Sequence, residues 1–267
     1  MLKARIVTAL LLILVLLAVV LWLPPAATVV ALTAVALAGA WEWSGFLRTP
    51  SLALRVAFVA LVAVLLPLSW RWSAIESGRD LIMGVAVAWW CVALGWILFA
   101  PRRVTPWTAA LAGVLALVPA WLALMRLRLD LPRGAEWMLF VLILVWVADI
   151  GAFFFGRRFG RRRLAPAVSP GKTWEGVVGG IAVSALFAVG GSGWFEVPLI
   201  VFVPLCLVAV AFSIVGDLTE SLLKRFAGMK DSVKVFPGHG GVMDRIDSVT
   251  AAAPVLFFGL TALGVGT

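Results

Sequence analysis

Acidic and basic side chains are dense between residues 216 and 248, in a chain that is otherwise mostly apolar. This segment holds five acids and five bases, which are Asp217, Glu220, Asp231, Asp244 and Asp247 with Lys224, Arg225, Lys230, Lys234 and Arg245. Mg²⁺ prefers oxygen ligands and is usually held by one or two carboxylates together with substrate phosphates. Lysine and arginine neutralise phosphate oxygens. The segment therefore indicates metal-assisted chemistry on a phosphate.

The first part of this segment has helical spacing. If residues 217–226 continue as a helix from the apolar run before them, four polar residues recur at i, i+3, i+4 and i+7 and share one face. These residues are Asp217, Glu220, Ser221 and Lys224. Asp217 directly follows an apolar run, so we expect it near the boundary between membrane and water.

The second part follows a glycine-rich turn. Residues 237–241 read Pro-Gly-His-Gly-Gly and contain the only histidine, His239, and the acids Asp244 and Asp247 follow three residues apart. Glycines let backbone N–H groups approach an anion closely. The alternative is an ordinary solvated loop with balanced charges, but such a loop needs no glycine turn beside a carboxylate pair. We therefore expect carboxylates from two elements to converge on one cation.

A second polar segment runs from residue 149 to 176. Asp149 follows twelve apolar residues, and an ionisable group inside a span usually faces a polar cavity and has a function. The alternative is a structural partner for an arginine. The five arginines at 157–163 are typical of a cytoplasmic membrane anchor, and at least one of them is expected to meet an anionic lipid head group.

The end of that segment carries a compact polar group suited to phosphate or nucleotide contacts, made of Ser169, Lys172, Thr173 and Glu175. Gly171-Lys172-Thr173 is similar to the end of a phosphate-binding P-loop. That motif needs a glycine five residues earlier, where this chain has Pro166, and no strand is predicted before it. A P-loop is therefore excluded.

Composition excludes several classes of protein. Of the 267 residues, 63% are hydrophobic and 13% are charged, against about 45–50% and about 25% in soluble domains. A soluble globular protein is therefore excluded. Cys91 and Cys206 lie in apolar runs, which argues against disulfides and thiol catalysis, and one histidine excludes a multi-histidine metal site. Nucleic-acid binding is excluded because no soluble domain combines exposed aromatic and basic residues.

The elements that must position these residues are expected to be membrane-spanning helices. A span needs about 20 mostly apolar residues, and the fold class is predicted to be an all-α, polytopic integral membrane protein with about nine spans. The expected spans are 6–23, 26–47, 52–69, 81–100, 107–125, 136–155, 176–195, 197–216 and 249–266. Residues 1–135 are expected to be an N-terminal scaffold and 136–267 a catalytic region with cytoplasmic loops 156–175 and 217–248.

Basic residues set the expected orientation. With a cytoplasmic N-terminus, seventeen of the 22 lysines and arginines face the cytoplasm, which satisfies the positive-inside rule. Both polar segments then lie on the cytoplasmic side. No transit peptide is visible, so a bacterial inner membrane is the expected location.

The polar segments also resemble a known family. The run from Ser221 to Asp247 reads S-x-x-K-R-x4-K-D, then P-G-H-G-G-x-x-D-R-x-D, and residues 169–176 read S-P-G-K-T-W-E-G. Both patterns resemble the phosphatidate cytidylyltransferases, also called CDP-diacylglycerol synthases. The resemblance implies that CTP and phosphatidic acid react to give CDP-diacylglycerol and pyrophosphate. It also implies a requirement for Mg²⁺ and allows a second cation such as K⁺. A homodimer is left open.

The resemblance and the residue chemistry together assign the expected roles. The expected catalytic residues are Asp217, Lys224, Arg225, Asp231, His239, Asp244, Arg245 and Asp247, with Asp217, Asp244 and Asp247 as metal ligands. The expected substrate-binding residues are Asp149, Ser169, Lys172, Thr173, Glu175, Ser221 and Lys230.

Three alternatives were weighed against this function. An ion-coupled transporter would use Asp149 and Asp217 as ion carriers, but it predicts broken spans in two repeated halves, and the sequence shows no repeat. Another class of membrane phosphotransferase carries an Asp-Gly-x-x-Ala-Arg pattern, and this chain has no Asp-Gly pair. A non-catalytic scaffold would leave the charges of 217–247 unexplained.

Overall fold

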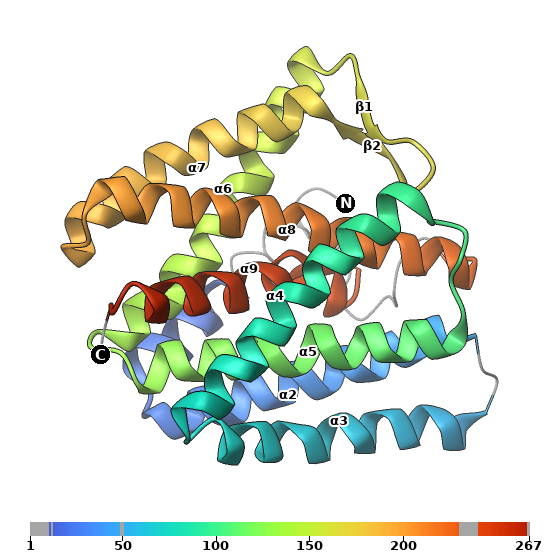
Figure 1. The fold of residues 1–267 in the computed structure, drawn as a ribbon, viewed down its shortest axis with the longest axis horizontal. Coiled ribbons are helices and arrows are strands. Elements are labelled where there is room, and N and C mark those ends of the chain that lie inside the picture. Colours follow the sequence, from blue (N-terminus) through green and yellow to red (C-terminus); the bar gives the residue numbers. More distant parts are fainter. Residues whose placement is uncertain (1–10, 12, 49–50, 230–239, 266–267) are drawn as a thin grey trace.

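The fold of the chain is a bundle of long helices, described here from a computed structural model (Figure 1). The structure describes residue 11 and residues 13–48, 51–229 and 240–265. Its elements in chain order are η1 (Ala18–Trp22), α2 (Pro25–Ser44), η2 (Gly45–Leu47), α3 (Leu52–Trp72), α4 (Glu76–Phe99), α5 (Pro106–Leu129), α6 (Gly134–Phe159), β1 (Arg163–Ala165), β2 (Ser169–Thr173), α7 (Trp174–Phe195), α8 (Leu199–Ala227) and α9 (Met243–Ala262).

Seven of the described helices are long and apolar enough to cross a membrane, namely α2 extended by η2, α3, α4, α5, α6, α7 and α8. The predicted class of multi-pass helical membrane protein is confirmed at this level. The expected span at 6–23 lies partly outside the described residues, and Ile13–Trp22 within it forms a shorter apolar helix. Helix α9 begins with three charged residues in its first five. The number of nine spans therefore stays a prediction.

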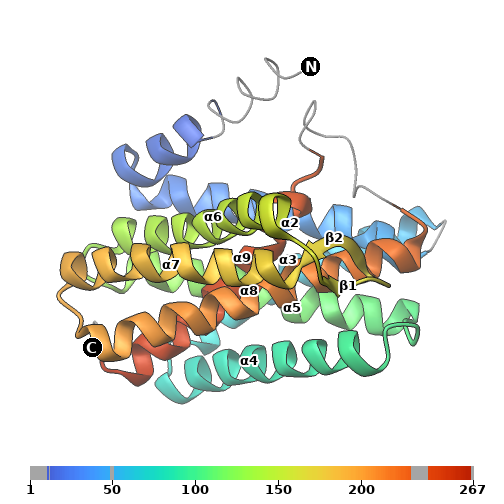
Figure 2. The ribbon, with the colours of Figure 1, turned by 90° about the horizontal axis from the view of Figure 1, so that it is seen from above.

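Helix α9 lies in the interior of the bundle (Figure 2), where it packs against α8, α5, α4 and α6. Every residue from Ser248 to Leu256 is buried, and three of them are the consecutive alanines 251–253. Small residues let neighbouring helices approach closely inside a membrane protein. These small apolar side chains allow α9 to lie in the interior of the bundle. This position places the acids in the first turns of α9 beside α8.

Helices α6 and α7 form a tightly packed hairpin because glycines of α7 face α6. A Cβ on Gly179 would lie 2.2 Å from the ring of Phe155, and one on Gly176 would lie 2.8 Å from the Ala152 carbonyl oxygen. The two helices are joined by β1 and β2, an antiparallel pair at 163–173. This pair is a local exception to the predicted all-α fold, and it falls inside the expected loop 156–175.

Candidate active site

The carboxyl-terminal half of α8 carries four of the predicted residues on one face. The helix continues to Ala227, as the spacing predicts, and ends at Gly228, whose φ of 72° suits glycine. Ser221 Oγ lies 3.4 Å from Asp217 Oδ1, and Lys224 Nζ lies 2.6 Å from Glu220 Oε2. Each pair is four residues apart, so the predicted shared face is confirmed.

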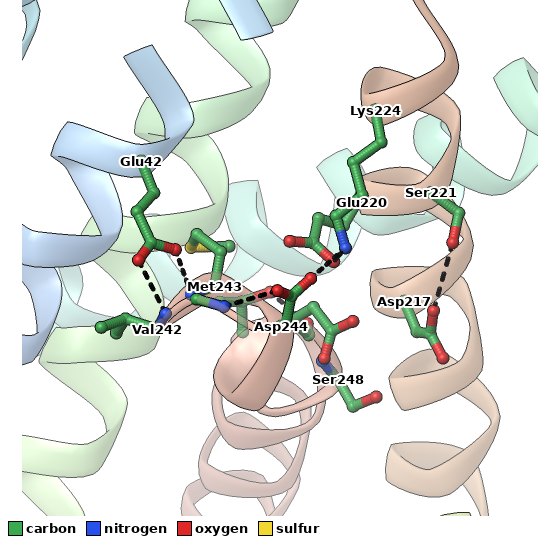
Figure 3. A network of polar contacts seen from close by, with 12 residues as sticks. Glu42, Asp217, Glu220, Ser221, Lys224, Val242, Met243, Asp244 and Ser248 are labelled. Atoms are coloured by element: carbon green, nitrogen blue, oxygen red, sulfur yellow. Dashed lines mark hydrogen bonds and ion pairs between the residues drawn. The ribbon is translucent and has the colours of Figure 1, made fainter. Parts of the chain in front are cut away.

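Lys224 joins α8 to the beginning of α9 (Figure 3). Its ammonium group forms ion pairs with Glu220 and with Asp244, whose side chain is 15% exposed. The second oxygen of Asp244 accepts a hydrogen bond from the backbone N–H of Gly241 at 2.7 Å. Gly240 has a φ of 75°, and a Cβ there would lie 2.2 Å from Asp244 Oδ2. The glycine turn is therefore needed for Asp244 to fold back on its own backbone.

Gly216 and Asp247 mark the close approach of α8 to α9. A Cβ on Gly216 would lie 2.5 Å from the backbone carbonyl oxygen of Asp247. This contact brings the Asp247 carboxylate toward Asp217, the next residue of α8. Enclosure by the surrounding helices and the negative charge of Asp217 raise the pKa of Asp247 above its usual range. The acid-bearing stretches of α8 and α9 thus lie side by side, and Glu220 and Asp244 share Lys224. The expected convergence of their carboxylates on one cation stays a prediction.

A cavity of about 520 Å³ opens beside these acids, between α6, the β1–β2 pair, α7 and α8. Its charged lining is formed by Asp149, Arg157, Arg163, Lys172 and Asp217, and Lys172 forms an ion pair with Asp217. The predicted polar cavity facing Asp149 is therefore present. Three cations around one hollow can bind a polyphosphate, because each neutralises a phosphate oxygen.

A second, apolar cavity of about 320 Å³ lies between the N-terminal helix, α2, α5, α6 and α9. Its α9 lining includes Arg245, Ile246 and Val249. The predicted catalytic residue Arg245 therefore lines a different cavity from Asp217. Helix α9 lines the apolar cavity and contributes no residue to the charged one.

Other predicted residues have structural contacts in this arrangement. Glu175 accepts hydrogen bonds from the backbone N–H groups of Arg161 and Arg162 and so fixes the start of the β1–β2 pair. Thr173 is buried and its hydroxyl accepts from Gly176 N at 3.2 Å, which caps α7.

Two further predicted residues lie near this pair, and three lie outside the described part of the chain. Arg225 Nε lies 3.4 Å from the Val168 carbonyl oxygen, and Ser169 begins β2. Lys230, Asp231 and His239 lie outside the described residues, so their roles stay predictions.

Sequence reasoning missed Glu42, an acid of α2 that is 2% exposed. Its two carboxylate oxygens accept hydrogen bonds from the backbone N–H groups of Val242 and Met243, both at 2.8 Å (Figure 3). This helix belongs to residues 1–135, which were expected to be a scaffold. The available signal was an isolated acid within an apolar span, the same signal that identified Asp149.

The donor set near α8 and α9 fits a hard divalent cation. It consists of carboxylates, and Glu220 Oε1 is buried with no hydrogen-bond partner among the described residues. The described ranges contain no group of three or more acidic, histidine or cysteine side chains already placed to hold a metal ion. Mg²⁺ commonly needs only one or two carboxylates when substrate phosphates complete its shell.

Comparison with known protein families shows the family of this chain. The family model described as the cytidylyltransferase family matches residues 3–263. This chain belongs to the cytidylyltransferase family. Two relatives of this family member are each named phosphatidate cytidylyltransferase. The one from Haemophilus influenzae is 39% identical over 278 residues, covering 95% of this chain and 96% of its own. The one from Pseudomonas aeruginosa is 42% identical over 287 residues, covering 100% and 99%.

A relative from Brucella suis with the same name is 38% identical over 195 residues, covering 68% of this family member and 66% of its own chain. The ion-transport alternative is not supported by these comparisons.

Proposed function

We propose that this chain is a phosphatidate cytidylyltransferase, which transfers CMP from CTP to phosphatidic acid and releases pyrophosphate. The observation that carries the proposal is a set of two ion pairs, Lys172 with Asp217 and Lys224 with Asp244, of which the first lines a cavity with three cations. It occurs in a chain that two relatives named for this reaction match over nearly their full length.

The reaction joins two anions, so charge neutralisation and alignment are its main demands. A phosphate oxygen of phosphatidic acid attacks the α-phosphorus of CTP and forms a new P–O bond. The bond from that phosphorus to the oxygen bridging the β-phosphate breaks, and pyrophosphate leaves with its electron pair. The attacking oxygen is already ionised, so no general base is needed. Lys172, Arg157 and Arg163 would hold the triphosphate in the charged cavity.

Asp217, Asp244 and Asp247 would hold Mg²⁺, which supplies further neutralisation of the phosphate oxygens. Lys224 already links Glu220 to Asp244 and keeps α8 and α9 in register. Ser221, bonded to Asp217, orients that carboxylate. A second cation such as K⁺ is part of the same proposal, by family resemblance alone.

The site would lie at the cytoplasmic boundary of an inner membrane, in a bundle of nine spans with a cytoplasmic N-terminus. What supports this placement is the charge distribution. Arg157, Arg163 and Lys172 line the charged cavity, and α8 carries Lys224 and Arg225 in its last turn. Lysines and arginines are concentrated on the cytoplasmic side of membrane proteins. CTP then enters from the cytoplasm, and the lipid enters from the bilayer.

The test is a product assay with purified protein, CTP labelled at the α-phosphate, phosphatidic acid and Mg²⁺. We expect label in a lipid-extractable product, and we expect Asp217→Asn to lower kcat at least about 100-fold because it removes a charge at the reacting phosphates. The control is Asp130→Asn, which changes an acid paired with Arg126 at 2.8 Å. Unlabelled lipid with wild-type protein would exclude the proposed function, and full turnover by Asp217→Asn would exclude the ligand assignment.

A further inference from the structure

We infer that Glu42 is a positioning residue for the transfer reaction, acting from α2 on the first turn of α9 and through it on Asp244. The inference rests on the proposed function for its kinetic consequences. The structural part of the inference, that Glu42 of α2 fixes the first turn of α9, does not depend on that function.

The first turn of α9 needs a partner from elsewhere. Helices begin with N–H groups that have no acceptor within the helix, and these are usually capped by the side chain at the N-cap. The N-cap residue here is Val242, which has no polar side chain, and no side-chain cap is present. Glu42 supplies the acceptors from another helix, one oxygen to Val242 N and one to Met243 N. Its negative charge also suits the positive end of the helix dipole.

Helix α2 is itself held firmly where Glu42 lies. The adjacent Trp43 donates from Nε1 to the Ala109 carbonyl oxygen of α5 at 2.8 Å, and its side chain is buried. One turn earlier, a Cβ on Gly39 would lie 3.1 Å from Met243 Sδ and 3.4 Å from Ile246 Cδ1. Helix α2 therefore contacts α9 one turn before Glu42 and is anchored to α5 at Trp43, so Glu42 holds α9 from a fixed support.

The segment held by Glu42 is the one that Asp244 folds back onto. Gly241 donates its N–H to Asp244 Oδ2, while the next two N–H groups donate to Glu42. Figure 3 shows the two carboxylates approaching this short segment from opposite sides, with Lys224 beyond Asp244. If the segment shifts, Asp244 loses its backbone partner and its position against Lys224. A displacement of about 1 Å at reacting groups can cost about 100-fold in rate.

The variant Glu42→Gln tests this role. It keeps the shape of the side chain, removes the charge, and puts an N–H₂ group where one acceptor was. We expect kcat to fall about tenfold or more and the KM for CTP to change by less than about threefold, because losing a charge-assisted hydrogen bond costs about 1.5–3 kcal/mol. Hydrogen–deuterium exchange should rise in the peptide covering residues 241–247 and stay unchanged in α6 and α7.

A matched control is Glu136→Gln, which changes another acid that ties two helices together. Glu136 accepts from Trp194 Nε1 at 2.7 Å and pairs with Arg133, and it lies at the beginning of α6. We expect kcat to stay within about twofold of wild type in this control, because it does not contact α9.

A double-mutant cycle with Val242→Pro isolates the contact. Val242 has a φ of −64°, which proline adopts, and proline removes the N–H that donates to Glu42. If the two residues act through this bond, Glu42→Gln should lower kcat less in the Val242→Pro background than in wild type.

Three results would overturn the inference. The first is a Glu42→Gln variant with the kcat and the hydrogen–deuterium exchange of wild type. The second is a rise in exchange over the whole protein together with a loss of folded protein. The third is a double mutant whose loss of kcat equals the product of the losses in the two single mutants. If Val242→Pro does not fold, kcat and peptide exchange in Glu42→Gln still decide. If wild-type protein forms no labelled lipid, the proposed function fails, and the exchange measurement alone tests whether Glu42 holds the first turn of α9.

Discussion

Two charged clusters, at the carboxyl ends of α5 and α8, lie on opposite sides of the bundle (Figure 1) and have different balances of charge. In the α5 cluster, buried Arg126 pairs with Asp130, donates to Ser73 Oγ at 2.8 Å, and lies 4.1 Å from the ring centroid of Trp70. One cation meets one acid, and the cluster ties α5 to the end of α3.

The α8 cluster is different because acids exceed the lysines that pair with them. Lys172 pairs with Asp217, and Lys224 pairs with both Glu220 and Asp244. Asp217 and Lys172 also line the charged cavity. Glu220 also keeps an unpaired buried oxygen among the described residues. A balanced cluster stabilises helix packing, whereas an excess of carboxylates beside a cavity is the arrangement that the proposed cation would balance. The comparison suggests that charge balance and access to a cavity distinguish structural from functional polar groups in such a bundle.

The largest effect should come from moving the two acid-bearing helices apart. Gly216→Val places atoms where the Asp247 carbonyl oxygen lies, 2.5 Å from the Cβ position. We expect kcat to fall about 100-fold or more, since the carboxylates of α8 and α9 would no longer meet. Turnover of labelled CTP measures it. The control is Gly190→Val in α7, where a Cβ meets nothing within 4 Å. Near-normal kcat in Gly216→Val would mean that the close approach is not needed.

An intermediate effect is expected from one cation of the charged cavity. Lys172→Met should raise the KM for CTP about tenfold and change kcat less, because it removes a charge-assisted contact to phosphate. Initial rates over a range of CTP concentrations measure both constants. Arg161→Met is the matched control, since Arg161 lies near the same strand pair, does not line the cavity, and keeps its backbone bond to Glu175. An equal rise in KM for both variants would contradict binding in this cavity.

The smallest effect on turnover should come from the balanced cluster. Arg126→Met removes the cation that links α5 to α3, so we expect the apparent Tm to fall by about 5 °C while kcat at 25 °C stays within about twofold of wild type. The apparent Tm is measured by size-exclusion chromatography of the folded protein that remains after heating. The kcat is measured with the product assay. A large loss of kcat without a loss of Tm would remove the distinction between the clusters.

Local patterns in the sequence predicted much of this arrangement. The long spans follow from apolar runs, and the shared face of Asp217, Glu220 and Lys224 follows from the period of a single helix. The glycine turn before Asp244 was recognised because an ordinary solvated loop does not need several glycines beside a pair of carboxylates. Each of these inferences uses neighbours in sequence, for which helix geometry fixes the relation.

Relations between distant elements were not predictable in the same way. Nothing local indicates that Glu42 reaches Val242, 200 residues away, or that Arg245 lines the apolar cavity while Asp244 beside it meets Lys224. These facts depend on which face of α9 each neighbouring helix covers. The short β1–β2 pair was missed because Glu175 and Arg162 stabilise it from outside the strands.

The distance along the chain between Glu42 and the amides that it binds has a consequence for biogenesis. Ribosomes make protein from the N-terminus at about 5–20 residues per second, so about 10–40 seconds pass between the synthesis of these two partners. During that interval α2 enters the bilayer with an acid whose hydrogen-bond donors, the backbone N–H groups at the beginning of α9, do not yet exist. A nascent chain must therefore shield this carboxyl group until α9 is made, and a product truncated before residue 242 would never complete the pairing.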